Sequence, residues 1–259
     1  MFFWKRNQNR NSANMEEQLY KALRRVEDPD FKKDLVTLGM IKDLKVEGSD
    51  IYFTIELTTP ACPLKDKLKN DCIEAITNDL GDDYSINIDF TSQVTTQRDT
   101  NSENLAGVKN IIAVSSGKGG VGKSSVAVNL AFGLAQSGAS VGLLDSDIHG
   151  PSLPTMLNLN GSKPEVEQDG EKVIMYPIEK HGVKTLSIGF LVDPEQPIVW
   201  RGPMVSSALK QLFNDTKWGE LDYLIVDLPP GTGDIHLTLA QQFPVTGALV
   251  VTTPQQVAV

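Results

Sequence analysis

The sequence predicts an α/β protein with a doubly wound, mostly parallel β-sheet, which a small α+β domain precedes. Three observations predict this fold. Continuous Val, Ile and Leu runs alternate with helical patterns in the second part of the chain, as in parallel sheets that helices cover on both faces. The first part combines amphipathic helices with alternating strands. Residues 93–107, which lie between the two parts, are polar and have the composition of a linker.

The first part, residues 15–92, is expected to form the small α+β domain. Its pattern predicts helices over 16–27 and 64–80, a strand or irregular edge over 35–47, and strands over 51–57 and 84–90. Cys72 falls on the apolar face of the second helix and is expected in the core. The polar, Asn-rich residues 1–14 are expected to be a disordered tail, and Met15 is a second candidate for the start of the protein.

The second part, residues 108–259, is expected to form the larger domain. Short apolar runs predict strands over 110–114, 141–144, 185–188, 223–226 and 248–251, and helical spacing predicts helices from Lys123 and over 204–213. The acidic stretch 165–171 is expected to be a solvated loop.

Composition excludes several function classes. The chain has 259 residues, of which 40% are hydrophobic and 22% charged, and its net charge is −9. A chain this acidic is a poor sequence-independent binder of nucleic acid, since phosphate neutralisation needs clustered Lys and Arg. No apolar run approaches the ~20 residues that span a bilayer. Two cysteines are too few for a disulfide framework, which favours a reducing compartment. We therefore predict a cytoplasmic protein without nucleic-acid or membrane partners.

A glycine-rich turn follows the first strand of the larger domain. Residues 117–124 read Gly-Lys-Gly-Gly-Val-Gly-Lys-Ser and fit the phosphate-binding pattern G-x-x-x-x-G-K-[ST] completely. The glycines allow successive N–H groups to face phosphate oxygens, and the helix that follows adds its positive end. Lys123 supplies a charge for the β- and γ-phosphates, and Ser124 a hydroxyl for Mg²⁺. The sequence thus predicts an ATP site, whose nucleotide-binding residues are Gly117, Lys118, Gly119, Gly120, Val121, Gly122, Lys123, Ser124, Ser125 and Gly231.

Three carboxylates follow predicted strands of this domain. Asp145 and Asp147 end the second strand, where ligands bind in such sheets, and Asp227 ends the apolar run 224–226 in a Walker B pattern. Asp227 is expected to hold Mg²⁺, Asp147 to orient the attacking water, and Asp145 to support Mg²⁺ or the loop backbone. The alternative for Asp145 and Asp147 is that they cap the turn that follows the strand. Gly231 is expected to offer its N–H to the γ-phosphate.

These motifs resemble a known class. Lys118 is a second lysine inside the phosphate loop, and it gives the deviant Walker A signature of the class that contains the nitrogenase iron protein, MinD and ParA. Residues 145–152 (DSDIHGPS), 200–204 (WRGPM) and 227–234 (DLPPGTGD) resemble the Mrp/ApbC iron–sulfur cluster carriers. Residues 58–64 (TTPACPL) resemble a stretch of the small SufT-like domain that is fused to bacterial Mrp proteins.

The resemblance implies a homodimeric, slow and dimer-dependent ATPase that carries a [4Fe–4S] cluster to apo iron–sulfur proteins. Lys118 would reach the ATP of the partner subunit, so the implied catalytic residues are Lys118, Lys123 and Asp147. Asp147 matches the switch I carboxylate of the family and Asp227 its Walker B carboxylate. Cys62 matches a functional thiol of the SufT-like domain, although a small buried side chain is an equal alternative.

One departure from the family is clear. The carriers hold their cluster with a Cys-x-x-Cys pair late in the ATPase domain, and Cys62 and Cys72 are the only cysteines of this sequence. We expect that the sequence is truncated at its C-terminal end and that the chain as given contains no cluster ligands. Reconstitution with iron and sulfide tests this, since a stable cluster absorbance contradicts it. Two alternative functions remain open, a ParA/MinD-like positioning ATPase and a scaffold that ATP locks as a dimer without hydrolysis.

Overall fold

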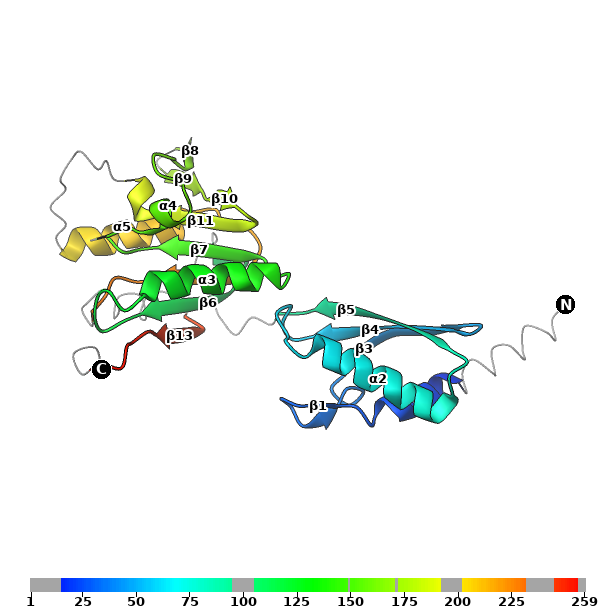
Figure 1. The fold of residues 1–259 in the computed structure, drawn as a ribbon. Helices are drawn as coiled ribbons and strands as arrows, with labels where there is room; N and C mark the ends of the chain where they lie inside the picture. Colours follow the sequence, from blue (N-terminus) through cyan, green and yellow to red (C-terminus); the bar gives the residue numbers. More distant parts are fainter. Residues whose placement is uncertain are drawn as a thin grey trace. The chain divides into compact units, whose positions relative to one another are not determined.

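The structure is a computed structural model that describes residues 15–94, 105–148, 150–170, 172–191, 202–231 and 245–255. Contacts divide the chain into two compact units with the boundary after Val94 (Figure 1). Within the described residues, no helix is both long and apolar enough to cross a membrane.

The first unit is a three-stranded sheet with helices packed against it. It begins with a helix over residues 15–23 and a short pair of strands, β1 (Glu27–Asp28) and β2 (Lys33–Asp34). The main sheet has the order β3-β4-β5, formed by β3 (Ile41–Glu47), β4 (Asp50–Leu57) and β5 (Ser85–Ser92). Helix α2 (Lys65–Leu80) connects β4 to β5, which run parallel as such a crossover requires.

The first helix is shorter than its periodicity predicts. The sequence predicts a helix over 16–27, but the helix ends at residue 23, and Asp28 accepts hydrogen bonds from the backbone N–H groups of Asp30 and Phe31. Pro29 disfavours a helical conformation at Asp28, and the β1–β2 pairing then turns the chain back. Cys72 is fully buried in the core beside Leu68 and Ile76, which confirms its predicted place.

The described residues of the second unit form a six-stranded sheet of order β10-β11-β7-β12-β6-β13, and among these strands only β10 is antiparallel to its neighbour. The strands are β6 (Val108–Ser115), β7 (Val141–Asp145), β10 (Ile178–Lys180), β11 (Val183–Ser187), β12 (Leu221–Asp227) and β13 (Gly247–Val250). The helices are α3 (Lys123–Gln136), α4 (Leu153–Met156) and α5 (Gly202–Asn214). The predicted mostly parallel α/β fold is confirmed.

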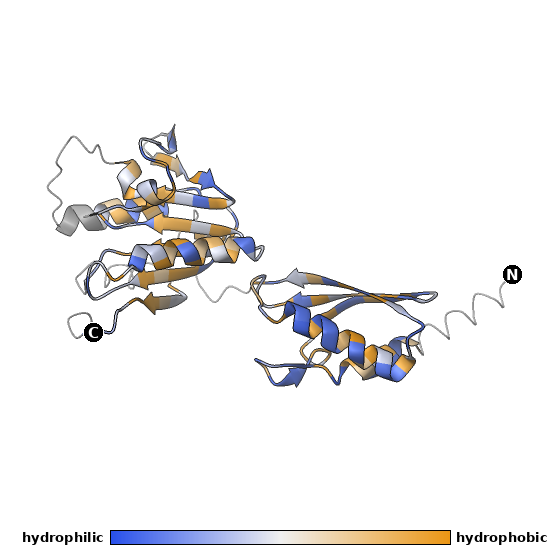
Figure 2. Ribbon diagram, in the orientation of Figure 1, coloured by the Kyte–Doolittle hydropathy of each residue, from blue (hydrophilic) through white to orange (hydrophobic). Residues whose placement is uncertain are grey.

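Successive residues of the central strands enter two different cores, which explains their continuous apolar sequences. Leu143 and Ile225 pack with residues of α3, whereas Leu144 and Leu224 pack with residues of α5. The sheet is therefore covered on both faces and doubly wound. Figure 2 shows β6 and β7 coloured as mostly hydrophobic along their length.

Residues 165–169 of the acidic stretch are not a loop, contrary to the expectation from its charge, and Glu171 lies outside the described residues. Residues 165–169 form strand β8 (Glu165–Asp169), which pairs with β9 (Lys172–Tyr176) in an antiparallel hairpin. The hairpin pairs the backbone, while the side chains of residues 165–168 stay exposed, Val166 included. On β9, Val173 is exposed, whereas Met175 is buried in the core. Charge patterns report exposure of side chains, and they do not report whether the backbone is paired.

Gly142 leaves room on strand β7 for the side chains of Leu221, Leu224 and Trp218. A Cβ atom at this position would lie 2.7 Å from Leu221 Cδ1, 2.9 Å from Leu224 Cδ1 and 3.1 Å from Trp218 Cε3, all of them buried. We expect Gly142→Ala to destabilise the second unit by about 1–3 kcal/mol, as overpacking of a dense core does. The matched control is Gly133→Ala on the exposed side of α3, where nothing lies within 4 Å. We expect this control to raise the free energy of unfolding by about 0.5–1 kcal/mol, because alanine has a higher helix propensity than glycine. Urea unfolding measures both changes, and equal effects would contradict the packing argument.

Candidate nucleotide-binding site

The candidate site lies at the carboxyl ends of three neighbouring parallel strands. In the pairing register, Asp227 at the end of β12 is opposite Val114 of β6 on one side and Asp145 of β7 on the other. Strand β12 therefore separates β7 from the strand that precedes the glycine-rich loop. This edge of a parallel sheet is where α/β proteins bind their ligands.

The glycine-rich loop adopts a conformation that its glycines permit. Gly120 and Gly122 have φ values of +81° and +90°, which are left-handed and favour glycine. Helix α3 begins directly after Gly122, whose position has no side-chain cap. The first N–H groups of a helix have no partners within it, so this N-terminus can donate to phosphate oxygens.

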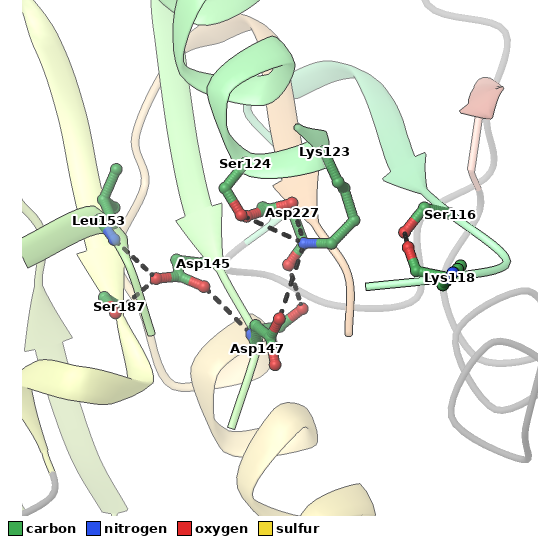
Figure 3. A network of polar contacts seen from close by, with 10 residues as sticks. Ser116, Lys118, Lys123, Ser124, Asp145, Asp147, Leu153, Ser187 and Asp227 are labelled. Atoms are coloured by element: carbon green, nitrogen blue, oxygen red, sulfur yellow. Dashed lines mark hydrogen bonds and ion pairs between the residues drawn. The ribbon is translucent and has the colours of Figure 1, made fainter. Parts of the chain in front are cut away.

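Lys123 connects the loop to the strand-end carboxylates (Figure 3). Its ammonium is buried, and it donates to Asp227 Oδ1 at 2.5 Å and to Ser124 Oγ at 3.4 Å. The same Nζ atom lies 3.8 Å from Asp147 Oδ2. Residues that are about a hundred positions apart in sequence thus meet around one positive charge.

Asp227 is a buried carboxylate whose charge depends on its neighbours. Burial raises its pKa, and the hydrogen bonds from Lys123 and Ser124 act in the opposite direction. Its backbone carbonyl accepts hydrogen bonds from Ser146 N at 3.0 Å and from Ser146 Oγ at 2.7 Å. The residue between Asp145 and Asp147 is therefore fastened to strand β12. Ser146 was not predicted to have any role, since a serine between two aspartates carries no distinct sequence signal.

Asp145 does not contact the lysine, and it fastens the backbone instead. Its Oδ1 accepts from Asp147 N at 3.1 Å, while its Oδ2 accepts from Leu153 N at 3.1 Å and from Ser187 Oγ at 3.0 Å. Of its two predicted roles, the geometry favours support of the loop. Burial raises the pKa of Asp145 to about 6, although these hydrogen bonds oppose the rise. The sequence does not predict a role for Ser187. The one feature that could have suggested it is that Ser187 is a polar residue at the end of an apolar strand.

The loop after β12 lies against the phosphate loop. Gly231 has a φ of +111°, and its N–H donates to Ser116 O at 2.8 Å. Ser116 Oγ in turn donates to Lys118 O at 3.0 Å. A Cβ atom on Gly119 would lie 3.9 Å from a ring carbon of Pro230. In this state the Gly231 amide is bonded to the loop, so contact with a γ-phosphate requires that this bond opens.

The remaining predicted site residues do not belong to the cluster around Lys123. Lys118 and Ser125 are exposed, and in Figure 3 Lys118 lies away from the cluster around Lys123. Val121 is half-buried. Cys62 belongs to the first unit, where it is half-buried and packs against the core. His149, Trp200, Arg201, Asp234 and His236, which the family-like stretches or their neighbourhood contain, lie outside the described residues.

The donor atoms fit a magnesium ion. Ser124 Oγ and the Asp227 carboxylate are hard oxygen donors of the kind that Mg²⁺ prefers, beside a phosphate-binding loop. The ammonium of Lys123 donates to both oxygen donors, so they already face a positive charge. Across the described ranges, no group of three or more His, Cys, Asp or Glu side chains could hold a metal ion.

Asp145 makes stability depend on pH in a direction that can be tested. Its pKa is about 6 in the folded state against a usual 3.8. Its contribution to the free energy of unfolding is fully present below pH ~4 and is lost as the pH rises through ~6. Between pH 4.5 and 7.5, we expect the free energy of unfolding of wild type to fall by on the order of 2 kcal/mol relative to that of Asp145→Asn. Urea unfolding of both proteins across this range measures the difference, and a constant difference would contradict the assignment.

A strand, a phosphate loop with its lysine, and a strand-end aspartate on a mostly parallel sheet together define a P-loop NTPase. Comparison with known proteins is consistent with this class. The family model described as NUBPL iron-transfer P-loop NTPase matches residues 107–259, and one described as iron–sulfur cluster assembly protein matches residues 16–89. The chain belongs to the family of NUBPL iron-transfer P-loop NTPases, with an iron–sulfur cluster assembly domain before it.

Curated relatives are similar over most of this chain. An iron–sulfur cluster carrier protein from Synechocystis is 50% identical over 92% of this chain and 67% of its own length. One from Deinococcus radiodurans is 49% identical over 94% of this chain and 68% of its own length. The chain therefore spans about two thirds of these relatives. A nucleotide-binding protein from Archaeoglobus fulgidus, solved in complex with ADP, is 40% identical with a TM-score of 0.50, over 60% of this chain and 58% of its own.

Proposed function

We propose that this chain binds ATP with Mg²⁺ and hydrolyses it to drive the assembly or transfer of [4Fe–4S] clusters to apo iron–sulfur proteins. The observation that carries the proposal is the convergence of Lys123, Ser124, Asp147 and Asp227 at the carboxyl edge of the sheet. The names of the relatives support the cluster-carrier role. A positioning ATPase is less supported, because those relatives are carriers.

Each site residue has a proposed role. The N–H groups of residues 117–125 hold the phosphates of ATP, and the ammonium of Lys123 turns from Asp227 to the β- and γ-phosphates. Ser124 and Asp227 hold Mg²⁺, which neutralises charge on the phosphates when it is bound. Asp147 orients the water that attacks the γ-phosphate. Gly231 exchanges its bond to Ser116 for one to the γ-phosphate, so the loop after β12 responds to ATP.

Lys118 is proposed to act on the partner subunit of a homodimer. Its side chain is exposed, and it lies away from the Lys123 cluster of its own chain (Figure 3). A lysine that acts across the interface makes hydrolysis slow in the monomer and dependent on dimer geometry. A [4Fe–4S] cluster is the cargo expected of the full-length family member, apo iron–sulfur proteins are the proposed clients, and the cytoplasm is the proposed compartment. Cys62, on the loop before α2, is proposed as an accessory thiol of the first unit.

Mixing two inactive variants tests this proposal. Lys118→Ala and Asp147→Ala are each expected to bind ATP and to lose most of the hydrolysis. In a mixed dimer, the subunit that carries Lys118→Ala keeps its Asp147 and receives Lys118 from its partner. We expect the mixture to recover roughly a quarter of the wild-type rate, since half of the dimers are mixed and each has one intact site.

The mixing experiment separates three outcomes. Recovery of activity supports a dimer in which Lys118 acts across the interface. No recovery, with wild-type hydrolysis intact, indicates that Lys118 acts within its own subunit or has no role. Failure of the wild-type chain to bind or hydrolyse ATP contradicts the proposed function itself. Size-exclusion chromatography of each variant with ATP is the control for dimer formation.

A further inference from the structure

Asp145 is a buried acidic residue without a proposed catalytic role. It is the last residue of β7, it is 1% exposed, and its main chain is paired with Ser187 on one side and Asp227 on the other. Burial of a carboxylate is unfavourable unless hydrogen bonds compensate for the lost water. The partners of Asp145 therefore indicate what this residue does.

Those partners lie at both ends of one loop. Asp147 N, at the start of the segment between β7 and α4, donates to Oδ1, and Leu153 N, the first residue of α4, donates to Oδ2. Ser187 Oγ on strand β11 also donates to Oδ2. One carboxylate thus closes the loop 146–152 and connects it to the neighbouring strand (Figure 3).

The loop carries Asp147 toward the ammonium of Lys123. Asp147 Oδ2 lies 3.8 Å from Lys123 Nζ, and the preceding Ser146 is bonded through its N and Oγ to the carbonyl of Asp227. Strand β12 therefore holds Ser146, and Asp145 holds the amide of Asp147. A carboxylate that orients water needs such fixed support, because small displacements reduce the rate strongly.

We propose that Asp145 is a positioning residue that holds Asp147 in its hydrolytic geometry by fastening both ends of the loop 146–152. This inference rests on the proposed function of the site, and it adds a residue that contacts neither nucleotide nor metal. Asp145 acts through Asp147, so its removal affects the chemical step and leaves nucleotide binding intact.

The test uses Asp145→Asn in the full chain. Asparagine has nearly the same size and is neutral, but its amide cannot accept from both loop ends through two oxygens. We expect ATP affinity to stay within about threefold, while kcat falls by about 100-fold. In the Asp147→Ala background, Asp145→Asn is expected to lower kcat by less than a further factor of about two, since the residue that Asp145 positions is absent.

Hydrogen exchange of the nucleotide-free protein provides a readout that does not depend on activity. The amides of Asp147 and Leu153 are expected to exchange at least about tenfold faster in Asp145→Asn, while amides within α3 stay protected. The matched control is Ser187→Ala, which removes one bond to Asp145 and the acceptor of Gly189 N, and leaves both loop amides paired. Its expected decrease in kcat is about threefold.

Three results would overturn the proposal. The first is a joint loss of ATP affinity and kcat, as in a general loss of structure. The second is an equal decrease from Asp145→Asn in the wild-type and Asp147→Ala backgrounds. The third is that Asp145→Asn needs a higher Mg²⁺ concentration for its half-maximal rate, which would indicate that Asp145 is a metal ligand. If wild type hydrolyses no ATP, the proposed function fails, and amide exchange still decides whether Asp145 fastens the loop.

Discussion

Replacing Lys123 with methionine is expected to weaken ATP binding by about 10- to 100-fold or more, since a hydrogen bond to a charged group contributes about 1.5–3 kcal/mol. Methionine keeps much of the length of lysine and removes the ammonium. The buried Asp227 then loses its 2.5 Å partner, and Asp147 loses the cation 3.8 Å away. Titration with a fluorescent ATP analogue in the presence of Mg²⁺ measures the affinity.

Two further variants separate charge from general effects on the protein. Lys123→Arg keeps the charge in a planar group that does not replace a compact ammonium, so partial affinity is expected. Lys210→Met makes the same chemical change on an exposed position of α5, and unchanged affinity is expected there. Unaltered ATP binding in Lys123→Met, with the protein folded by circular dichroism, would remove the basis of the nucleotide-site assignment.

Asp147→Ala is expected to lower kcat for ATP hydrolysis by about 10²- to 10⁴-fold, the range that a positioned acid–base group contributes. ATP affinity is expected to change little, because Lys123 keeps its closer partner, Asp227, when its 3.8 Å contact with Asp147 is removed. The side chain of Asp147 is 13% exposed, so it is open enough to meet a water molecule while it stays close to Lys123. Single-turnover kinetics with saturating protein measure the chemical step.

The same variant discriminates between the proposed ATPase and a scaffold that ATP only locks as a dimer. Unchanged hydrolysis in Asp147→Ala favours the scaffold or a different water-orienting residue. Glu179→Gln on the exposed edge strand β10 is the control for the loss of one negative charge, and it is expected to leave kcat unaltered. A decrease in that control would mean that net charge, and not position, determines the rate.

Much of the architecture could be predicted because its signals are local. The run 110–114 predicts β6 and the run 223–226 predicts β12, since each strand is apolar on both faces. Prediction was wrong where signals compete. Residues 24–27 continue a helical pattern, but Pro29 and the β1–β2 pairing end the helix earlier. The acidic stretch 165–169 is strand β8, because charged side chains are compatible with an exposed hairpin.

The phosphate loop, its lysine and the strand-end aspartates follow from the amino-acid sequence alone. Eight consecutive residues specify both the tight turn and the start of α3, so no distant contact is needed to recognise them. The tertiary structure decides how these parts meet. Strand β12 inserts between β6 and β7, which makes Asp227 the closest partner of Lys123 and places Asp147 at a greater distance. Strand order and register arise from packing on both sheet faces, and no local pattern encodes that Ser187 and Leu153 close on Asp145.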